Sequence, residues 1–310
     1  MKNLFLYVLT VAIWGSTWYA ITFQLNGIPT QVSVSYRFAL ATVLLFLWCW
    51  FRRLRLRFSA QEHVLLMLLG LTLFSINYVL FYEAEKHVVS SGVAIIFSLL
   101  VVFNIVNSWL LFGSKPTRQV VAGAALGLLG IVLTFWQDLR TMNSSSQSLW
   151  GIVLSLAATL CASFGNLVSA RLQKRQIPVV PANAFGMLYG TVALLAYAVL
   201  SGARFSFDIS TGYIVSLAYL AFFGSVIAFS AYLTLIGRIG ADRAAYTSIL
   251  FPIVALVFSA AFEHYQLTLL GALGIACVLA GNGLVLLRKR RANGAITISS
   301  IEARTKGIEG

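Results

Sequence analysis

Long apolar runs, separated by short clusters of charged residues, dominate the sequence. A bilayer core about 30 Å thick requires roughly 20 apolar residues per spanning helix. The sequence therefore predicts an all-α integral membrane protein with ten transmembrane helices. We place these helices near residues 3–24, 32–51, 64–82, 88–112, 119–137, 149–170, 181–201, 212–236, 243–262 and 266–287.

The basic residues between these runs predict how the chain is oriented. If the N-terminus is cytoplasmic, 18 of the 22 Lys and Arg residues lie on the cytoplasmic side. Lys86, Arg140 and Arg204 lie outside, and Arg37 falls within a span. Membrane proteins concentrate basic residues in their cytoplasmic loops. We expect a multi-pass protein of the cell (cytoplasmic) membrane with both termini in the cytoplasm.

Composition excludes two other classes of protein. The chain is 59% hydrophobic and 10% charged, whereas soluble domains average about 45–50% and about 25%. A soluble enzyme is therefore excluded. The net charge of +13 lies in short loops rather than in a basic stripe, so the expected partner is the lipid bilayer and not a nucleic acid. Cys49, Cys161 and Cys277 lie in apolar runs without metal-ligand spacing, and we expect no metal or cofactor.

The second half of the chain repeats features of the first at an offset of about 150 residues. Each half holds five predicted spans, an odd number, so the second half must enter the bilayer from the opposite side. The sequence thus predicts two five-helix inverted repeats, at 1–137 and 149–287, with a linker at 138–148 and a basic end and disordered tail at 288–310. The matched features are Pro29 with Pro181, Ser75 with Ser225, Tyr82 with Tyr232, and Gly123–Gly130 with Gly274–Gly281.

Inverted repeats are recurrent in secondary transporters, which bind their substrates near the midplane between the repeats. Polar and aromatic residues inside the spans are therefore candidates for a central site. Asn104 and Asn166, for example, belong to uncharged polar stripes, which must face protein or water. The candidate substrate-binding residues are Trp14, Trp18, Tyr36, Arg37, Asn77, Tyr78, Tyr82, Phe97, Asn104, Asn166, Tyr189, Tyr232 and Tyr246.

Each candidate also has a purely structural interpretation. The tryptophans would then fill the core, and the tyrosine hydroxyls would link neighbouring helices. Arg37 either binds a substrate carboxylate or steers anions at the outer mouth, or it has a structural role. In that role it snorkels to the surface or pairs with an acidic group such as Glu263 or Glu83, and its shallow depth favours the structural role. No acidic residue lies at the centre of a span, so proton coupling would have to use groups at the outer rim. Those possible coupling groups are Glu83, Glu85, Glu263 and His264.

Glycine-rich spans leave the oligomeric state open. The fifth predicted span of each half contains one Gly-rich run, which permits close approach of a neighbouring helix. These runs serve packing within a monomer or contact in a homodimer.

Several short motifs, in order along the chain, resemble the EamA family of the drug/metabolite transporter superfamily. This resemblance implies that spans 1–4 and 6–9 surround a central cavity and that spans 5 and 10 are peripheral. It also implies export of small metabolites, as in the YddG-type amino acid exporters. The motifs are Trp14-Gly15-Ser16-Thr17, Pro29, Tyr36-Arg37-Phe38-Ala39, Phe251-Pro252, Glu263, Leu267-Thr268 and the Gly271–Gly283 run.

The first half departs from the pattern of the second at two positions. Leu100 stands where the second half has Pro252, and Ser114 where it has Glu263. The predicted function is a secondary transporter that moves small amphiphilic metabolites, amino acids among them, outward by alternating access. The alternative is an intramembrane enzyme or lipid-handling protein with a polar central cavity. The sequence offers no catalytic residues for it.

Overall fold

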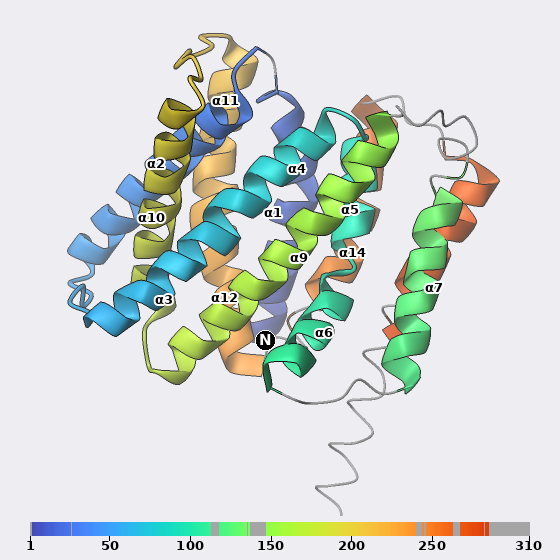
Figure 1. Cartoon of the computed structure of the whole chain (residues 1–310), viewed down its shortest axis with the longest axis horizontal. Helices are drawn as coiled ribbons and strands as arrows, with labels where there is room; N and C mark the ends of the chain where they lie inside the picture. The colour runs from blue at the N-terminus through green and yellow to red at the C-terminus, as the bar shows by residue number, and fades with distance from the viewer. Residues whose placement is uncertain are drawn as a thin grey trace, which may run out of the picture.

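The computed structural model describes residues 2–25, 27–112, 118–134, 136, 147–239, 244, 246–262, 267–281 and 283–284. Within these ranges the chain is helical and has no strand, which confirms the all-α membrane class. Figure 1 shows the arrangement of the helices. The labelled elements are α1 (Lys2–Thr22), α2 (Thr30–Phe51), α3 (Ala60–Leu71), the π-helix η1 (Thr72–Ile76), α4 (Asn77–Glu85), α5 (Ser90–Phe97), α6 (Leu100–Phe112), α7 (Arg118–Thr134), α9 (Gln147–Lys174), α10 (Val179–Leu200), α11 (Thr211–Tyr219), the π-helix η2 (Leu220–Ile227), α12 (Ala228–Ile239) and α14 (Tyr246–Phe262).

Seven helical segments are long and apolar enough to cross a membrane. They match the predicted spans 1–4 and 6–8 in order. Three shorter apolar helices, Val121–Thr134, Leu250–Phe262 and Leu269–Gly281, coincide with predicted spans 5, 9 and 10. Because the described part of these three helices is short, the count of ten spans stays a prediction. The seven long segments are Asn3–Thr22, Thr30–Phe51, Ala60–Glu85, Ser90–Leu111, Gln147–Lys174, Val179–Leu200 and Thr211–Ile239.

Local sequence signals explain where several helices begin. Ser59 and Glu62 form a capping box at the start of α3, in which each side chain accepts a hydrogen bond from the other residue's backbone N–H. Pro29 is the N-cap of α2, and Pro178 is the N-cap of α10. Matching Pro29 with Pro181 was therefore wrong in detail, because Pro181 lies inside the first turn of α10.

Three predicted spans are interrupted in the structure. The third and eighth spans contain η1 and η2, which lie at corresponding points of the two halves. The fourth span is broken at Ser98–Leu99, between α5 and α6, where the Ser98 hydroxyl donates to the Ile95 carbonyl over 2.6 Å. The first half therefore breaks its fourth span next to Leu100 without a proline, whereas Pro252 lies inside α14.

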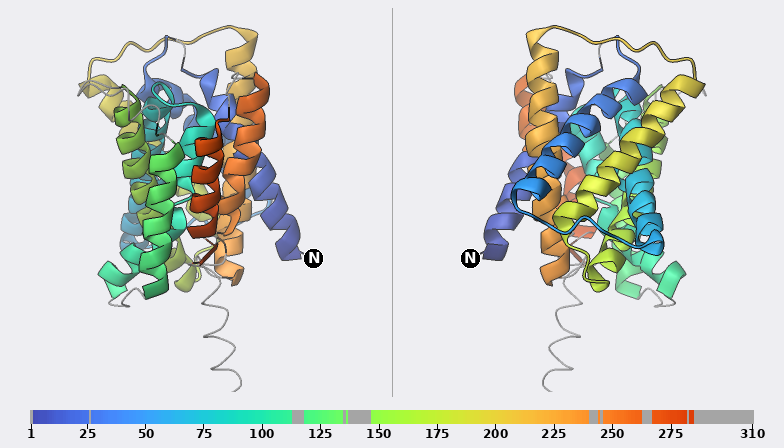
Figure 2. Two further views of the ribbon diagram at one scale, coloured as in Figure 1. Left: turned by 90° about the vertical axis from the view of Figure 1, so that its right-hand side faces the viewer. Right: turned by 90° about the vertical axis from the view of Figure 1, so that its left-hand side faces the viewer.

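Contacts between the halves come in matched pairs. The first span packs on the eighth (α1 on α12), and the sixth packs on the third (α9 on α4). The first also packs on the ninth (α1 on α14), and the sixth on the fourth (α9 on α6). The seventh span packs along the second, so that α10 and α2 lie side by side in Figure 1. The side views in Figure 2 show the helices running along a common direction as a bundle.

Glycines join the fifth helix of each half. A Cβ built at Gly281 would lie 2.5 Å from the carbonyl oxygen of Gly123, and one built at Gly130 would lie 2.5 Å from that of Gly274. The backbones of α7 and of helix Leu269–Gly281 therefore touch directly, as small residues allow in membranes. These glycines serve packing within the chain. The choice between monomer and homodimer stays a prediction.

Candidate functional site

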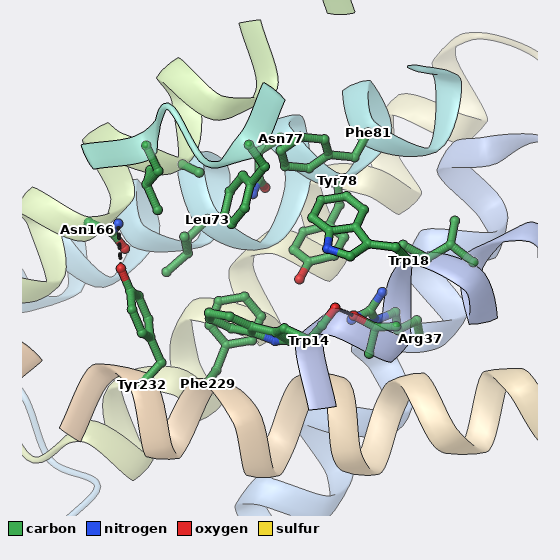
Figure 3. Close-up of a pocket in the computed structure, with 15 residues that line it drawn as sticks. Trp14, Trp18, Arg37, Leu73, Asn77, Tyr78, Phe81, Asn166, Phe229 and Tyr232 are labelled. Atoms are coloured by element: carbon green, nitrogen blue, oxygen red, sulfur yellow. Dashed lines mark hydrogen bonds between the residues drawn. The ribbon is translucent and has the colours of Figure 1, made fainter. Parts of the chain in front are cut away.

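A cavity lies between the two halves at the centre of the bundle. Its volume is about 40 Å³. Both halves contribute walls, with α1, α2, η1, α4, α5 and α6 on one side and α9 and α12 on the other (Figure 3). The lining residues are Trp14, Thr17, Trp18, Ile21, Arg37, Leu73, Asn77, Tyr78, Phe81, Phe97, Leu100, Ala162, Asn166, Phe229 and Tyr232.

Seven of the fifteen lining residues are aromatic. Trp14 packs edge-on against Phe229, with ring centroids 4.7 Å apart, and lies 4.9 Å from Tyr232. Trp18 packs edge-on against Phe81 at 5.2 Å and lies 5.6 Å from Phe97. Such tilted and edge-to-face pairs hold the rings in fixed orientations. The resulting wall suits a flat apolar group.

Arg37 lies at one end of this cavity, and only 1% of its surface is exposed. Its Nε–H donates to the Ser225 hydroxyl over 3.0 Å, and its Nη1–H donates to the Tyr82 hydroxyl over 3.2 Å. The guanidinium carbon also lies 4.6 Å from the centre of the Tyr78 ring. Because Ser225 belongs to η2, the arginine links the second, third and eighth predicted spans.

The predicted pairing of Arg37 with Glu83 is wrong. Glu83 accepts a hydrogen bond from Lys86 over 2.8 Å, with both side chains partly exposed. Glu83 is therefore engaged with Lys86 and not with Arg37, whereas the buried carboxylate of Glu85 acts on Arg37 electrostatically. Glu83 thus bonds to Lys86, which lies three residues further along the chain at the end of the same helix. The other proposed partner, Glu263, lies outside the described residues.

The opposite end of the cavity is polar but uncharged. The Asn166 amide nitrogen donates to the Tyr232 hydroxyl over 3.3 Å (Figure 3). Three buried polar atoms of lining residues have no hydrogen-bond partner in the described structure: Asn166 Oδ1, Asn77 Oδ1 and Trp18 Nε1. Buried polar atoms are normally satisfied. These three atoms are therefore available to a molecule inside the cavity.

The structure brings eight predicted site residues to this cavity and places four others elsewhere. Tyr82 lies behind Arg37, as its hydrogen-bond acceptor. Tyr36 packs on Phe207, and Tyr189 bonds to the His63 ring. Asn104 is buried in α6 away from the lining. The eight that line it are Trp14, Trp18, Arg37, Asn77, Tyr78, Phe97, Asn166 and Tyr232.

Of the remaining candidates, the structure describes some only in part or not at all. Glu85 is buried at the end of α4. Tyr246 begins α14, but its side chain lies outside the described residues. Glu263 and His264 also lie outside them.

Sequence reasoning missed the apolar lining, because such residues resemble ordinary core. Thr17 and Ile21 had a usable signal: with Trp14 and Trp18 they fall at i, i+3, i+4 and i+7 on one face of α1. The other missed lining residues are Leu73, Phe81, Leu100, Ala162 and Phe229.

Comparison with known proteins decides the family. The model of the EamA-like transporter family matches residues 1–136 and 149–287, which is most of the chain. The chain belongs to the EamA-like transporter family. This membership confirms the resemblance seen in the motifs. It also indicates a transporter rather than the enzyme considered as the alternative.

Similar EamA proteins are known in several bacteria. The uncharacterized inner membrane transporter YedA of Escherichia coli (strain K12) is 28% identical over 279 residues, covering 89% of this chain and 88% of YedA. The uncharacterized transporter YoaV of Bacillus subtilis (strain 168) is 25% identical, covering 90% and 95%. A protein named probable amino-acid metabolite efflux pump in Escherichia coli (strain K12) is 25% identical, covering 90% and 93%. These names support a multi-pass membrane transporter.

A solved crystal structure shares the fold. It superposes with a TM-score of 0.69 at 17% identity, covering 94% of this chain and 98% of the other. At this identity the match bears on the fold alone.

Proposed function

We propose that this EamA protein is a secondary transporter that moves small amphiphilic metabolites, amino acids among them, outward across the cytoplasmic membrane by alternating access. The observation that carries the proposal is the cavity enclosed between the two halves, with aromatic walls and a polar group at each end. A flat apolar body with polar termini matches that lining.

The small size of the cavity favours a mechanism in which the walls move. Binding pockets for organic ligands typically enclose roughly 300–1,000 Å³, whereas this cavity encloses about 40 Å³. A metabolite therefore requires helices of the two halves to separate. Alternating access supplies that separation, because one half rocks against the other around a fixed site.

A hydrogen-bond network closes the bundle near the start of α2. The Gln24 amide nitrogen donates to the Tyr213 carbonyl over 2.9 Å and to the Ser216 hydroxyl over 2.5 Å. The Ser33 hydroxyl donates to the Gln24 amide oxygen over 3.1 Å. In the orientation predicted from the basic loops, this network lies on the outer side. The described conformation would then be closed to the outside.

The paired contacts between halves and the two π-helices at corresponding positions support an inverted repeat of ten spans. In such a repeat each half supplies an equivalent moving surface. The movement that opens the cavity to the outside then mirrors the movement that opens it to the cytoplasm.

Flux into proteoliposomes tests the proposal. Purified protein is reconstituted, and uptake of a labelled amino acid panel is measured with and without a pH gradient, against protein-free liposomes. Saturable, protein-dependent flux is expected for aromatic and large aliphatic members. Absence of flux for the whole panel, from protein shown to be folded, would overturn the proposed substrates. Dependence on the gradient would assign coupling to rim groups, of which Glu83, Glu85, Glu263 and His264 are the candidates.

A further inference from the structure

Arg37 is a buried cation at the wall of the cavity. A guanidinium has five N–H donors and no acceptor. The structure gives it two hydrogen bonds, both to neutral hydroxyls, Ser225 through Nε and Tyr82 through Nη1. The Tyr78 hydroxyl is a further acceptor next to the guanidinium, so three neutral hydroxyls lie beside its five N–H donors.

Mainly neutral groups hold this guanidinium in place. The Tyr78 ring covers one part of it at 4.6 Å, and the Phe38 ring lies 5.5 Å from it. A Cβ built at Gly224 would lie 3.1 Å from Nη2, so a side chain at this position of η2 would crowd the guanidinium. The hydroxyls and rings in contact with the guanidinium carry no charge, and the carboxylate that attracts it, Glu85, is not among the lining residues of the cavity. A positive charge inside a bilayer normally faces a cavity or a partner.

The lining of the cavity is asymmetric in charge. Its fifteen lining residues include one cation, Arg37, and no carboxylate. The opposite end offers the neutral Asn166–Tyr232 pair. Figure 3 shows Arg37 at one end, that pair at the other, and Trp14 and Phe229 between them. The site therefore offers a formal counter-charge to an anion and none to an ammonium group.

We propose that Arg37 binds the carboxylate of the transported molecule, and that the cavity selects aromatic monocarboxylates without requiring an α-amino group. The planar fork of arginine matches the two oxygens of a carboxylate. The rings of Trp14 and Trp18, one turn apart on α1, receive the apolar body. The inference rests on the proposed function, since it names the substrate class of the same site.

Three compounds that share a phenylethyl body separate the charges. They are 3-phenylpropanoate (carboxylate alone), L-phenylalanine (carboxylate and ammonium) and 2-phenylethylamine (ammonium alone). Flux of each is measured in proteoliposomes of the unmodified protein, and binding is measured by its tryptophan fluorescence, because Trp14 and Trp18 line the cavity. Phenylpropanoate and phenylalanine are expected to be bound and carried, and phenylethylamine to be neither.

Variants connect this selectivity to Arg37. Arg37→Lys keeps the charge but loses the fork, and the KM for phenylpropanoate is expected to rise roughly 10- to 100-fold, the range for hydrogen bonds to charged groups. Arg238→Lys is the matched control, because Arg238 is exposed and bonds only to Asn3 in the described structure. Tyr82→Phe and Ser225→Ala each remove one hydroxyl that holds the guanidinium. If Arg37 were only a lock between helices, these two variants would reproduce the Arg37→Lys defect for all solutes alike.

The outcomes separate the two proposals. Equal binding or flux of phenylethylamine and phenylpropanoate by the unmodified protein would overturn the role of Arg37 and leave transport standing. Carboxylate-selective binding without flux would support Arg37 and overturn transport. Neither binding nor flux of any of the three compounds would overturn both.

Discussion

Replacing Trp14 by phenylalanine removes one hydrogen bond between the halves and keeps an aromatic ring. The Trp14 Nε1–H donates to the Gly224 carbonyl in η2 over 3.0 Å, across a sequence separation of 210 residues. Trp18→Phe is the matched control, because Trp18 Nε1 has no partner in the described structure. Both indoles are 7% exposed and both line the cavity. The loss of ring volume is therefore closely similar in the two variants.

The difference between the two variants isolates the hydrogen bond. One such bond contributes about 0.5–1.5 kcal/mol net to stability. We expect the free energy of unfolding to fall by roughly 1 kcal/mol more in Trp14→Phe than in Trp18→Phe, about a fivefold change in the folded-to-unfolded ratio. Unfolding by SDS titration in mixed micelles measures it. Equal losses in the two variants would refute the argument that this bond joins the halves.

Three further changes test helix packing, a helix cap and a buried hydrogen bond, and the same titration measures the stability of each variant. Gly281→Ala should destabilise by about 1–3 kcal/mol, because its Cβ meets the backbone of α7; Gly283→Ala, with no described atom within 4 Å of its Cβ, should change stability by less than about 0.5 kcal/mol. Similar values would contradict the close packing of the two fifth helices. Ser59→Ala should cost about 0.5–2 kcal/mol by removing the cap of α3 while leaving flux unchanged; an unchanged stability would show that the cap contributes nothing. Tyr232→Phe should cost about 1–3 kcal/mol, because it leaves the buried Asn166 amide without its acceptor; a neutral result would remove this pair from the list of stabilising contacts.

Span positions could be predicted because length and apolarity alone decide which segments cross a bilayer. Each described helical segment of the bundle coincides with a predicted span, and the ends differ by a few residues. The interruptions could not be predicted in this way. The residues of η1, Thr72–Ile76, are ordinary apolar and hydroxyl residues, and a π-turn depends on how neighbouring helices pack. The break after Ser98 likewise has no proline or glycine to announce it.

The candidate site was predictable where several of its residues share one face of a helix. Spacing put Trp14 and Trp18 on one face of α1, and the structure places both at the cavity. Spacing cannot say which face meets the cavity and which meets a neighbouring helix. Asn104 belongs to a predicted polar stripe, yet it is not among the lining residues. Tyr36 directly precedes Arg37 but packs on Phe207, outside the cavity. The partner of Arg37 depends on contacts between residues 188 positions apart, which no local pattern contains.

The two π-helices are joined to the opposite half by different donors. Trp14 of the first span donates to a carbonyl in η2, and Cys161 of the sixth span donates its thiol to the Thr72 carbonyl in η1 over 3.3 Å. These are corresponding contacts of the two halves, with the first span on the eighth and the sixth on the third. An indole N–H is a stronger donor than a thiol, so the contact at η2 is the stronger one. Under the proposed alternating access, these two corresponding contacts between the halves would be unequal. This inequality would favour the conformation in which the contact at η2 is made, which is the conformation described.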